Sequence, residues 1–383
     1  MRICIDSRKI KKGEIFVPVK GEKYDGHSFI KEALKKGAKK VWDIDLGKLA
    51  HDYKKKYSIP IIAITGSSGK TTVKDLLHSV LSQKYKVLKS KENENNQIGL
   101  PLTLLKLNSQ YDLVILEMAM RNSGDIEYLT KIAEPTHIII TNIGLTHIER
   151  LKSQLNIVKA KSEIFNNNSE NKKYAYLNKN TGFLGYLKKS ARRSGYKIRF
   201  FSGNNAFSQN KDLVEKVAKD FSLKKEQIKK GINKWKPSNN RMEFLTLKNN
   251  VLIINDSYNA NPDSMKAAMN YFGKYKGRKI AVLGDMLELG SISKREHIKL
   301  GKLLRENNVN YLFSFGKFAK MIKFGNKNKI NISNHKKLFL EIVKYLKPRD
   351  TILVKGSRGM KLDIVVNSLV SKYKLKKKEY FKY

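Results

Sequence analysis

The sequence predicts an α/β protein of three domains: a small N-terminal α/β unit, a central parallel sheet with a phosphate-binding loop, and a C-terminal Rossmann-like sheet. Two series of alternating strands and helices predict the larger sheets, one from Ile59 to about Trp235 and one beginning after Pro237. Apolar strands separated by helices are typical of parallel sheets that are covered on both faces. A chain of 383 residues is long enough for each of these domains to bury a core.

Residues 1–58 are expected to form the first domain. It would contain a strand around Ile3 and Ile5, a second strand in GEIFVPV, and a helix from Ser28 to Lys36. A unit of this size is too small to carry much chemistry alone.

Residues 59–236 are expected to form the central domain, with ligands at the carboxyl ends of its strands. The expected strands are Ile59–Thr65, Asp112–Met118 and Thr136–Ile143, and the expected helices are Lys70–Leu81, Asp125–Ala133 and Leu155–Phe165.

Residues 237–383 are expected to form the C-terminal domain. Its strands are expected near Val251–Asp256, Lys279–Gly284, Tyr311–Phe315 and Thr351–Lys355. The domain has no G-x-G-x-x-G fingerprint, so we do not expect a dinucleotide there. The last segment, Ser371 to Tyr383, is expected to be a charged, frayed tail.

A glycine turn in IPIIAITGSSGKTT, between the first central strand and helix, predicts a cradle for phosphate. Backbone N–H groups near Gly66 and Gly69 can face anionic oxygens, the helix start adds the positive end of its dipole, and Lys70 can reach the terminal phosphates. Ile64 stands where the usual G-x-x-x-x-G-K-[ST] loop has its first glycine, so this loop is shorter. The residues expected at a nucleotide are Gly66, Ser67, Ser68, Gly69, Lys70, Thr71 and Thr72. The alternative is an ordinary turn with a solvated lysine, but the flanking strand and helix patterns favour the cradle.

Three further side chains are expected near this loop. Glu117 ends the strand DLVILEM, where a buried carboxylate needs a cation such as magnesium. His147 follows the strand THIIITNIG, and Lys161 lies on the next helix. Taken singly, a loop histidine is more often a hydrogen-bonded residue and a helical lysine is more often solvated. Their conjunction with the phosphate loop favours a shared site.

The composition is strongly basic, with a formal net charge of +44. The lysines are scattered over most predicted helices and loops, so we expect solvated basic faces that favour anionic substrates, and no specific nucleic-acid partner. The apolar runs are too short for membrane insertion. A single cysteine, Cys4, favours a reducing cytoplasm. We expect a monomer.

Several long motifs resemble the Mur ligase family, in order and over nearly the whole chain. The motifs are ITGSSGKTT, ENNQIGLPLTLL, EMAMRNSGDIEYLTKIAEPTHIIITNIGLTHIERL, AKSEIF, NRMEF, NDSYNANPDSMKAAM, LGDMLELG and LVKGSRGMKL. The opening IDSRKIKKGEIFVPVKGEKYDGHSFIKEALKKGA is similar to that family's uridine-binding domain. DSYNANP and DMLELG are most similar to the member that adds D-alanyl-D-alanine.

The resemblance implies an ATP-dependent carboxylate-amine ligase of peptidoglycan precursor synthesis. Such an enzyme joins D-alanyl-D-alanine to UDP-N-acetylmuramoyl-tripeptide through an acyl phosphate, and it uses magnesium. The alternatives are another Mur-type ligase, a ligase similar to folylpolyglutamate synthetase, a catalytically silent homologue, and a basic ATPase that binds nucleic acid. YNANP in place of an arginine-bearing acceptor motif speaks against the first two. The chain retains all four residues that the family pattern makes catalytic, which argues against a catalytically silent homologue. These residues are Lys70, Glu117, His147 and Lys161.

The resemblance also implies roles for particular residues. Lys70, Glu117, His147 and Lys161 would be catalytic, and Thr71, Glu117, His147 and Lys161 would serve the metals, with Lys161 carbamoylated by carbon dioxide. Asn210, Arg241 and Asn259 would contact the nucleotide, the last within a closing loop that includes Asp256, Tyr258 and Asn261. Ser7, Arg8, Asn96 and Asn261 would contact substrate.

The chain departs from the family pattern in two places. The first domain lacks a leading segment and a strand-helix portion. The central domain is shortened between Asn178 and Asn210, where a β-rich portion is missing and the helix that carries the adenine-contacting asparagine is reduced to NKDLVEKVA.

Overall fold

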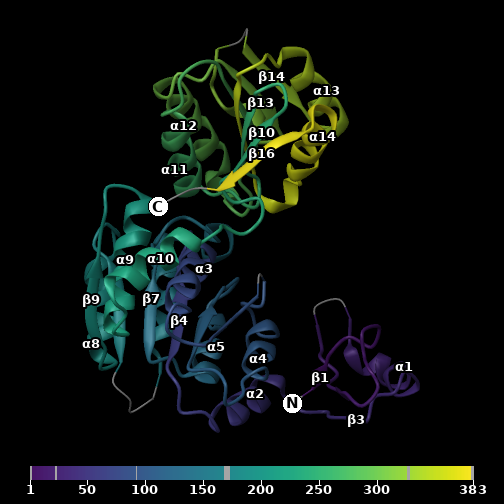
Figure 1. Cartoon of the computed structure of the whole chain (residues 1–383), viewed down its shortest axis with the longest axis vertical. Coiled ribbons are helices and arrows are strands. Elements are labelled where there is room, and N and C mark those ends of the chain that lie inside the picture. The colour runs from purple at the N-terminus through teal and green to yellow at the C-terminus, as the bar shows by residue number, and fades with distance from the viewer. Residues whose placement is uncertain (1, 22–23, 92, 168–172, 326–327, 381–383) are drawn as a thin grey trace.

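The computed structural model describes residues 2–21, 24–91, 93–167, 173–325 and 328–380. Figure 1 shows three α/β parts: the small N-terminal unit lies beside one end of the central domain, and the C-terminal domain lies beyond the opposite end. This agrees with the three-domain fold predicted from the sequence. The domain limits at residues 58 and 236 stay predictions.

The N-terminal unit is a short three-stranded parallel sheet in the order β1-β2-β3. Its elements are β1 (Ile3–Cys4), β2 (Ile15–Phe16), η1 (Gly26–Phe29), α1 (Ile30–Lys35) and β3 (Lys40–Val41). The buried residues of this unit's own cluster are Ile10, Phe16 and Ala33, so its core is small, as expected.

Helix α2 (Leu46–Lys54) follows this sheet but packs against the central domain. A Cβ atom on Gly47 would lie 2.3 Å from the hydroxyl oxygen of Tyr128 on α5 (Asp125–Ala133), so glycine allows α2 and α5 to approach closely. Tyr53 donates a hydrogen bond to the carbonyl of Leu107 (2.9 Å), and Lys54 pairs with Glu134 at 2.7 Å.

The central sheet is parallel throughout, in the order β5-β6-β4-β7-β8-β9. Its strands are β4 (Ile61–Thr65), β5 (Val87–Lys89), β6 (Leu113–Glu117), β7 (His137–Ile140), β8 (Tyr174–Asn178) and β9 (Lys197–Phe201). All residues of β4, β6 and β7 are buried, which explains why these strands were recognisable in the sequence.

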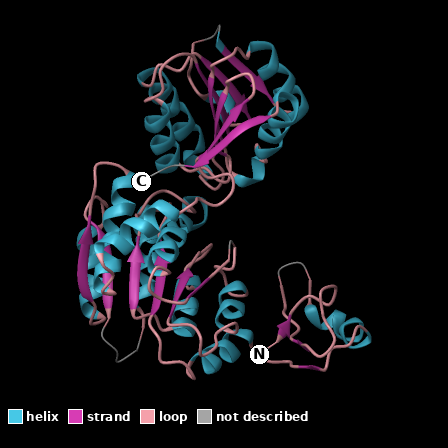
Figure 2. Cartoon of the chain, in the orientation of Figure 1, coloured by secondary structure: helices cyan, strands magenta, loops and turns pink. Residues whose placement is uncertain are grey.

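Helices cover both faces of this sheet (Figure 2), and each face has its own apolar cluster. One layer contains α3 (Lys70–Leu81), α9 (Ala206–Asp220) and α10 (Lys225–Lys234). The other contains α4 (Gly99–Leu104), α5 (Asp125–Ala133), α7 (Gln154–Ser162) and α8 (Leu184–Arg193), with the short α6 (Ile148–Leu151) and η2 (Glu163–Phe165) beside α7.

Four expected elements of the central domain are shorter than predicted. The strand expected over Ile59–Thr65 begins at Ile61, and the strand expected over Asp112–Met118 spans Leu113–Glu117. The strand expected over Thr136–Ile143 ends at Ile140, because the next residues turn toward the phosphate loop. The helix expected to end at Phe165 ends at Ser162 and continues as η2.

The C-terminal sheet has the order β14-β13-β12-β15-β11-β10-β16, parallel from β14 to β11 and antiparallel at β10 and β16. Its strands are β10 (Glu243–Leu247), β11 (Leu252–Asp256), β12 (Lys279–Gly284), β13 (Tyr311–Phe315), β14 (Lys329–Ile332), β15 (Thr351–Lys355) and β16 (Leu375–Tyr380). Its helices are α11 (Pro262–Phe272), η3 (Gly290–Ile292), α12 (Ser293–Glu306), η4 (Ala319–Met321), α13 (His335–Tyr345), η6 (Arg358–Met360) and α14 (Asp363–Tyr373).

The expectation of a frayed tail after Ser371 is wrong. Helix α14 continues to Tyr373, and β16 pairs with β10 along the sheet edge. Lys378 Nζ lies 2.8 Å from Oε1 of the buried Glu243. The lysines that suggested a solvated tail are those of an edge strand, where charge protects the open edge from pairing with other chains. Residues 381–383 lie outside the described residues.

Among the described residues, no helix has both the length and the apolar character needed to cross a bilayer.

Replacement of Lys378 by methionine tests the role of β16. Glu243 is buried and would lose its cation, so we expect Lys378→Met to lower the free energy of unfolding by about 1–3 kcal/mol in urea titrations. Lys377→Met is the control, because Lys377 pairs with Glu379 on the exposed surface and should change stability by less than about 0.5 kcal/mol. Equal effects of the two variants would contradict a stabilising ion pair between Lys378 and the buried Glu243.

Candidate active site

The phosphate loop depends on two glycines whose backbone lies in the left-handed region. The φ angle is 148° at Gly66 and 79° at Gly69. A Cβ atom on Gly66 would lie 1.9 Å from Oγ1 of Thr141, so a larger residue would clash. Gly69 is the N-cap of α3, and the helix starts at Lys70. The N–H groups of its first turn, which have no intrahelical partner, therefore lie at the loop.

The loop is fixed by the residues that follow β7. Asn142 Oδ1 accepts hydrogen bonds from the backbone N–H groups of Ser67 (3.1 Å) and Ser68 (2.9 Å). Thr141 Oγ1 donates to the carbonyl of Ser68 at 2.6 Å, and the N–H of Gly144 donates to Oγ of Ser67 at 2.8 Å. The central sheet thus holds the loop in shape through its neighbouring strand.

Lys70 lies over the loop, where Nζ donates to the carbonyl of Gly66 at 2.8 Å. Burial lowers the pKa of Lys70 below its usual value, and the charge of Arg241 adds to this, while the carboxylates of Glu117 and Glu288 oppose it. Burial is thus the main cost to the ammonium form of Lys70, and the negative charges of phosphate groups would stabilise that form.

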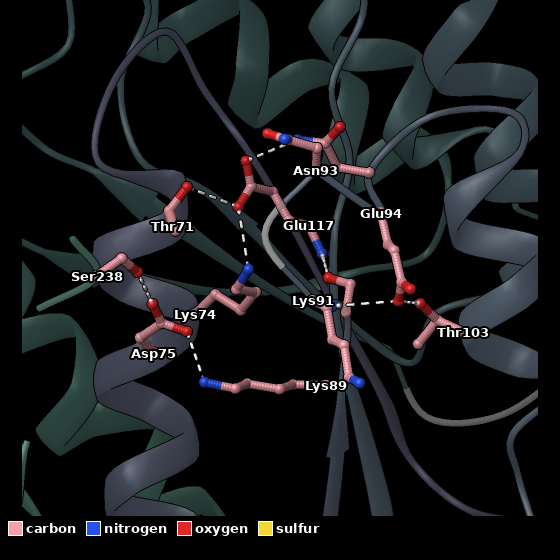
Figure 3. Close-up of polar contacts among 12 residues, drawn as sticks. Thr71, Lys74, Asp75, Lys89, Lys91, Asn93, Glu94, Thr103, Glu117 and Ser238 are labelled. Carbon is pink, nitrogen blue, oxygen red and sulfur yellow. Dashed lines mark hydrogen bonds and ion pairs between the residues drawn. The ribbon is translucent and has the colours of Figure 1, made fainter. Parts of the chain in front are cut away.

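Glu117, at the end of β6, contacts the first turns of α3 and the segment that leads to α4 (Figure 3). Its Oε2 accepts a hydrogen bond from the Thr71 hydroxyl at 2.8 Å and lies 3.6 Å from Nζ of Lys74. Its Oε1 accepts from Asn95 Nδ2 at 3.0 Å, and its backbone N–H donates to Oγ of Ser90 at 3.0 Å. The carboxylate is thus buried but fully provided with partners.

Lys161 on α7 is only 2% exposed. Burial lowers its pKa well below the usual value, and the charge of Lys70 lowers it further. Among the described residues, no carboxylate forms an ion pair with its amine. The charge of Lys70 thus acts on Lys161, whose buried position disfavours an ordinary ammonium group.

His147 precedes α6, with a φ of 66°, and contacts the C-terminal domain. Its Nδ1 lies 2.6 Å from Oε2 of Glu288. This contact is the main reason that the pKa of Glu288 lies below its usual range, and Arg150 and Arg121 add to the effect. His147 thus joins two domains.

Arg241 reaches the phosphate loop from the C-terminal domain. Its Nη2 donates to Oγ1 of Thr71 at 3.2 Å, and its guanidinium carbon lies 3.8 Å from the ring centroid of Tyr258. Its Nε is buried without a hydrogen-bond partner in the part of the chain that the structure describes. A donor left unpaired beside the loop fits an anionic ligand.

A second contact between the domains is formed by Tyr258, Asn93 and Arg358. The Tyr258 hydroxyl donates to Asn93 Oδ1 at 2.8 Å. Arg358 Nη1 donates to the same amide oxygen and to the Tyr258 oxygen, both at 3.1 Å. The loops after β11 and β15 therefore meet the segment that leads to α4.

In the rest of the expected closing loop, Asp256 and Asn259 contact their own domain, whereas Asn261 contacts the phosphate loop. Asp256 pairs with the buried Lys355 at 2.5 Å, and the carbonyl of Asn259 accepts from the same ammonium at 2.9 Å. Asn261 caps α11 and donates to the carbonyl of Ser67 at 3.4 Å. Asn261 therefore lies against the phosphate loop.

Asn210 and Asn96, which are expected to contact the nucleotide and the substrate respectively, differ in their distance from the phosphate loop. Asn210 on α9 lies beside the phosphate loop, since its Oδ1 is 3.8 Å from the position of a Cβ atom on Gly69. Asn96 Oδ1 instead accepts from the backbone N–H groups of Ile98 (3.1 Å) and Gly99 (2.9 Å), so it caps the start of α4.

Ser7 and Arg8 are not brought to the phosphate loop, because the N-terminal unit lies away from the junction of the two larger domains (Figure 1). Ser7 is buried and donates to Glu32 at 2.9 Å. The Arg8 side chain is 80% exposed and pairs with Asp6 at 2.8 Å.

Sequence reasoning assigned no role to several residues of the site, and five of them make contacts that position the charged groups or join the domains. They are Lys74, Asn95, Asn142, Glu288 and Arg358. Lys74 lies one helical turn after Lys70, and Asn142 directly follows a predicted strand, so periodicity and strand ends could have indicated both. Asn95 is hidden in the polar run ENENNQ, where nothing distinguishes it from its neighbours.

Family models match three consecutive parts of the chain. The Mur ligase family catalytic domain matches residues 2–55, the Mur ligase middle domain matches residues 64–261, and the Mur ligase glutamate ligase domain matches residues 240–358. The chain belongs to the Mur ligase family.

Relatives of the Mur ligase family are similar over nearly their whole length. The UDP-N-acetylmuramoyl-tripeptide–D-alanyl-D-alanine ligase of Bacillus subtilis is 33% identical over 96% of this chain and 93% of its own length. A crystal structure of MurF from Acinetobacter baumannii has a TM-score of 0.88 at 26% identity, covering 97% of this chain and 93% of that one. The MurF ligase of Thermotoga maritima in complex with ADP has a TM-score of 0.83 at 27% identity, covering 97% of each chain.

The matched regions of the Mur ligase models include the site described above. The middle-domain model begins at the end of β4 and continues through the closing loop, and the third model spans Arg241 to Arg358. Arg241 and Tyr258 lie where the two matches overlap, and the contact between Arg358 and Asn93 joins the C-terminal match to the middle-domain match.

Removal of the Lys70 charge tests the phosphate loop. Lys70→Ala should lower ATP-dependent turnover by at least about 10²-fold, because the positive charge lies where phosphate charge must be held. Turnover is measured as phosphate release, and circular dichroism checks the fold. The exposed Lys86 supplies the control Lys86→Ala, which should keep wild-type turnover. Near wild-type turnover of Lys70→Ala would exclude this loop as the phosphate site.

Proposed function

We propose that this chain is an ATP-dependent ligase that joins D-alanyl-D-alanine to UDP-N-acetylmuramoyl-tripeptide. The observation that carries the proposal is the cluster of Lys70, Thr71 and Glu117, which faces Arg241 across two domains of a Mur ligase family chain. The relatives similar over 96–97% of the chain carry the name of this ligase, and the structure from Thermotoga maritima was solved with ADP. These names do not support another Mur-type ligase or a silent homologue.

The first step would transfer the γ-phosphoryl group of ATP to the carboxylate of the tripeptide. A carboxylate oxygen forms a bond to phosphorus, the bond to the β-phosphate oxygen breaks, and ADP leaves. Lys70 and the first N–H groups of α3 would hold the transferred charge, and the unpaired Nε of Arg241 would donate to a phosphate from the other domain.

The second step would form the amide bond. The dipeptide amine attacks the carbonyl carbon of the acyl phosphate and forms a tetrahedral intermediate. The bond to the phosphate oxygen then breaks, phosphate leaves, and the former amine nitrogen loses a proton. The cations beside the loop would stabilise the negative charge on the tetrahedral oxygen and the departing phosphate.

Magnesium fits the donor set at Thr71 and Glu117. Both supply hard oxygen atoms, which this ion prefers, and the described residues contain no group of three acidic, histidine or cysteine side chains that could hold a metal alone. Bound with ATP, the ion would neutralise phosphate charge and orient the γ-phosphoryl group. His147 stays a predicted ligand of a second ion.

Lys161 is proposed to react with carbon dioxide. Its lowered pKa favours the neutral amine, whose nitrogen can bond to the carbon of CO₂ and release one proton to solvent. The carbamate carries one negative charge, which would suit a buried position near Lys70. The support for this step is the burial of the amine and the position of Lys161 in the family pattern.

The family pattern also supplies the remaining proposed roles. Asn210 and Asn259 would contact the nucleotide, Asn96 and Asn261 the substrate, and Ser7 and Arg8 the uridine diphosphate. Exposure of Arg8 leaves its guanidinium accessible to such a ligand, whereas Ser7 would have to leave Glu32. The single cysteine, Cys4, fits a reducing compartment, and we place the ligase in the cytoplasm as a monomer.

Phosphate release from ATP tests the proposed function. With UDP-N-acetylmuramoyl-tripeptide present, sustained release should require D-alanyl-D-alanine, because the amine consumes the acyl phosphate. Mass spectrometry should detect the pentapeptide product. Addition of L-alanyl-L-alanine is the control and should not sustain release. Release that is independent of both substrates would contradict the proposal.

A second experiment tests Lys161. Lys161→Ala should be nearly inactive, and small carboxylates such as acetate should restore part of the activity by occupying the vacated space. The wild type should lose activity in buffer depleted of carbon dioxide at mildly acid pH, where a carbamate decomposes. Lys159 is exposed on the same helix, so Lys159→Ala is the matched control. Full activity of Lys161→Ala would remove this residue from the mechanism.

A further inference from the structure

Lys74 is a buried cation that the proposed reaction does not use. It lies one turn after Lys70 on α3, it is 1% exposed, and its Nζ is 3.6 Å from Oε2 of Glu117 (Figure 3). A lysine this deeply buried needs a compensating charge. Glu117 supplies this charge beside the phosphate loop.

Glu117 receives only neutral donors apart from Lys74. Thr71 donates to one carboxylate oxygen and Asn95 to the other. Thr71 also accepts from Arg241, so its hydroxyl hydrogen is directed to Glu117. Within the described ranges, Lys74 forms the ion pair that balances this carboxylate.

The neighbouring carboxylate of Asp75 has hydrogen-bond partners of its own. Its Oδ1 accepts from Lys89 at 2.7 Å and its Oδ2 from Ser238 at 2.5 Å. Burial raises the pKa of Asp75, but the charge of Lys74 and the contacts with Lys89 and Ser238 hold it below its usual value. Figure 3 shows the contacts of Asp75 with Ser238 and Lys89, and, separate from them, the contact between Lys74 and Glu117. Among the described residues, Lys74 therefore forms its ion pair with Glu117, while its charge also acts on Asp75.

We propose that Lys74 is a positioning residue that balances Glu117, keeps its carboxylate aimed at Thr71, and makes magnesium binding depend on nucleotide phosphates. The inference rests on the proposed function, in which Thr71 and Glu117 hold the ion. A carboxylate that is already balanced by Lys74 has little net attraction for a bare divalent cation, because Lys70 and Arg241 lie close by as well. The phosphates of the nucleotide supply the missing negative charge and ligands.

Thermal unfolding of the full chain, without nucleotide or peptide substrate, tests the proposal. Millimolar Mg²⁺ alone should hardly change the unfolding temperature of the wild type. Lys74→Met should unfold at a lower temperature without metal, and Mg²⁺ alone should then stabilise it, with an affinity roughly tenfold higher than in the wild type. The exposed Lys86 provides the control Lys86→Met, which should behave as the wild type does.

ADP binding, measured by calorimetry with and without Mg²⁺, gives a second readout. In the wild type, ADP and Mg²⁺ should each strengthen the binding of the other, and Lys74→Met should reduce this coupling. A role in packing alone would lower the unfolding temperature without changing the response to Mg²⁺. An Mg²⁺ response of Lys74→Met equal to that of the wild type would therefore overturn the proposal.

The double variant Lys74→Met/Glu117→Gln covers the case in which Lys74→Met does not fold. Removal of both charges leaves neutral side chains of similar size, so the double variant should fold and would then support the pairing. Failure of the double variant to fold would overturn the proposal. None of these measurements uses a peptide substrate, so their failure leaves the proposed ligase reaction standing, and a missing ligase activity leaves them unaffected.

Discussion

The hydrogen bond from Thr71 to Glu117 joins the parts of the molecule on which the site depends. Thr71 belongs to the first turn of α3, and Glu117 ends the neighbouring strand β6. The bond therefore fixes the start of the helix relative to the sheet, with the N–H groups of the first turn left at the loop. Because Thr71 also accepts from Arg241, the same hydroxyl connects the central domain with the C-terminal domain. A change at this position would disturb the loop, the carboxylate and the domain contact together.

The balance of charge around this hydrogen bond explains which ligand the site suits. Lys70, Lys74 and Arg241 bring cations to the loop, whereas the carboxylate of Glu117 accepts the hydrogen bond of Thr71. Such an excess of positive charge is unfavourable in a buried region unless a polyanion is present. A nucleotide triphosphate with its metal ion meets this need, while a neutral ligand does not. The scattered lysines of the surface add little to the charge that acts at this site, because solvent and salt screen them.

Much of this arrangement was predictable from the sequence, because buried parallel strands and a glycine loop leave strong local patterns. The positions of Lys70, Glu117 and Arg241 followed from strand ends and motifs, and the structure brings all three together. Other parts had no local signal. The strand Leu375–Tyr380 has the composition of a tail, and only its pairing with β10 makes it a strand. Asn95 and Asn96 are chemically identical neighbours, and the geometry of the turn decides that Asn95 contacts Glu117 while Asn96 caps a helix.

The antiparallel strand β10, which a purely parallel Rossmann-like sheet would lack, has a direct consequence for the site. In the central sheet, the loop and Glu117 lie at the carboxyl ends of β4 and β6. In the C-terminal sheet, Tyr258 and Arg358 follow the carboxyl ends of the neighbouring parallel strands β11 and β15. Because β10 runs opposite to β11, its beginning lies at this same edge, and Arg241 just precedes it. The reversed direction of β10 therefore places the guanidinium of Arg241 at the edge where the two sheets meet. Both domains can contribute charged residues to one phosphate site because the carboxyl edges of the two parallel sheets face each other.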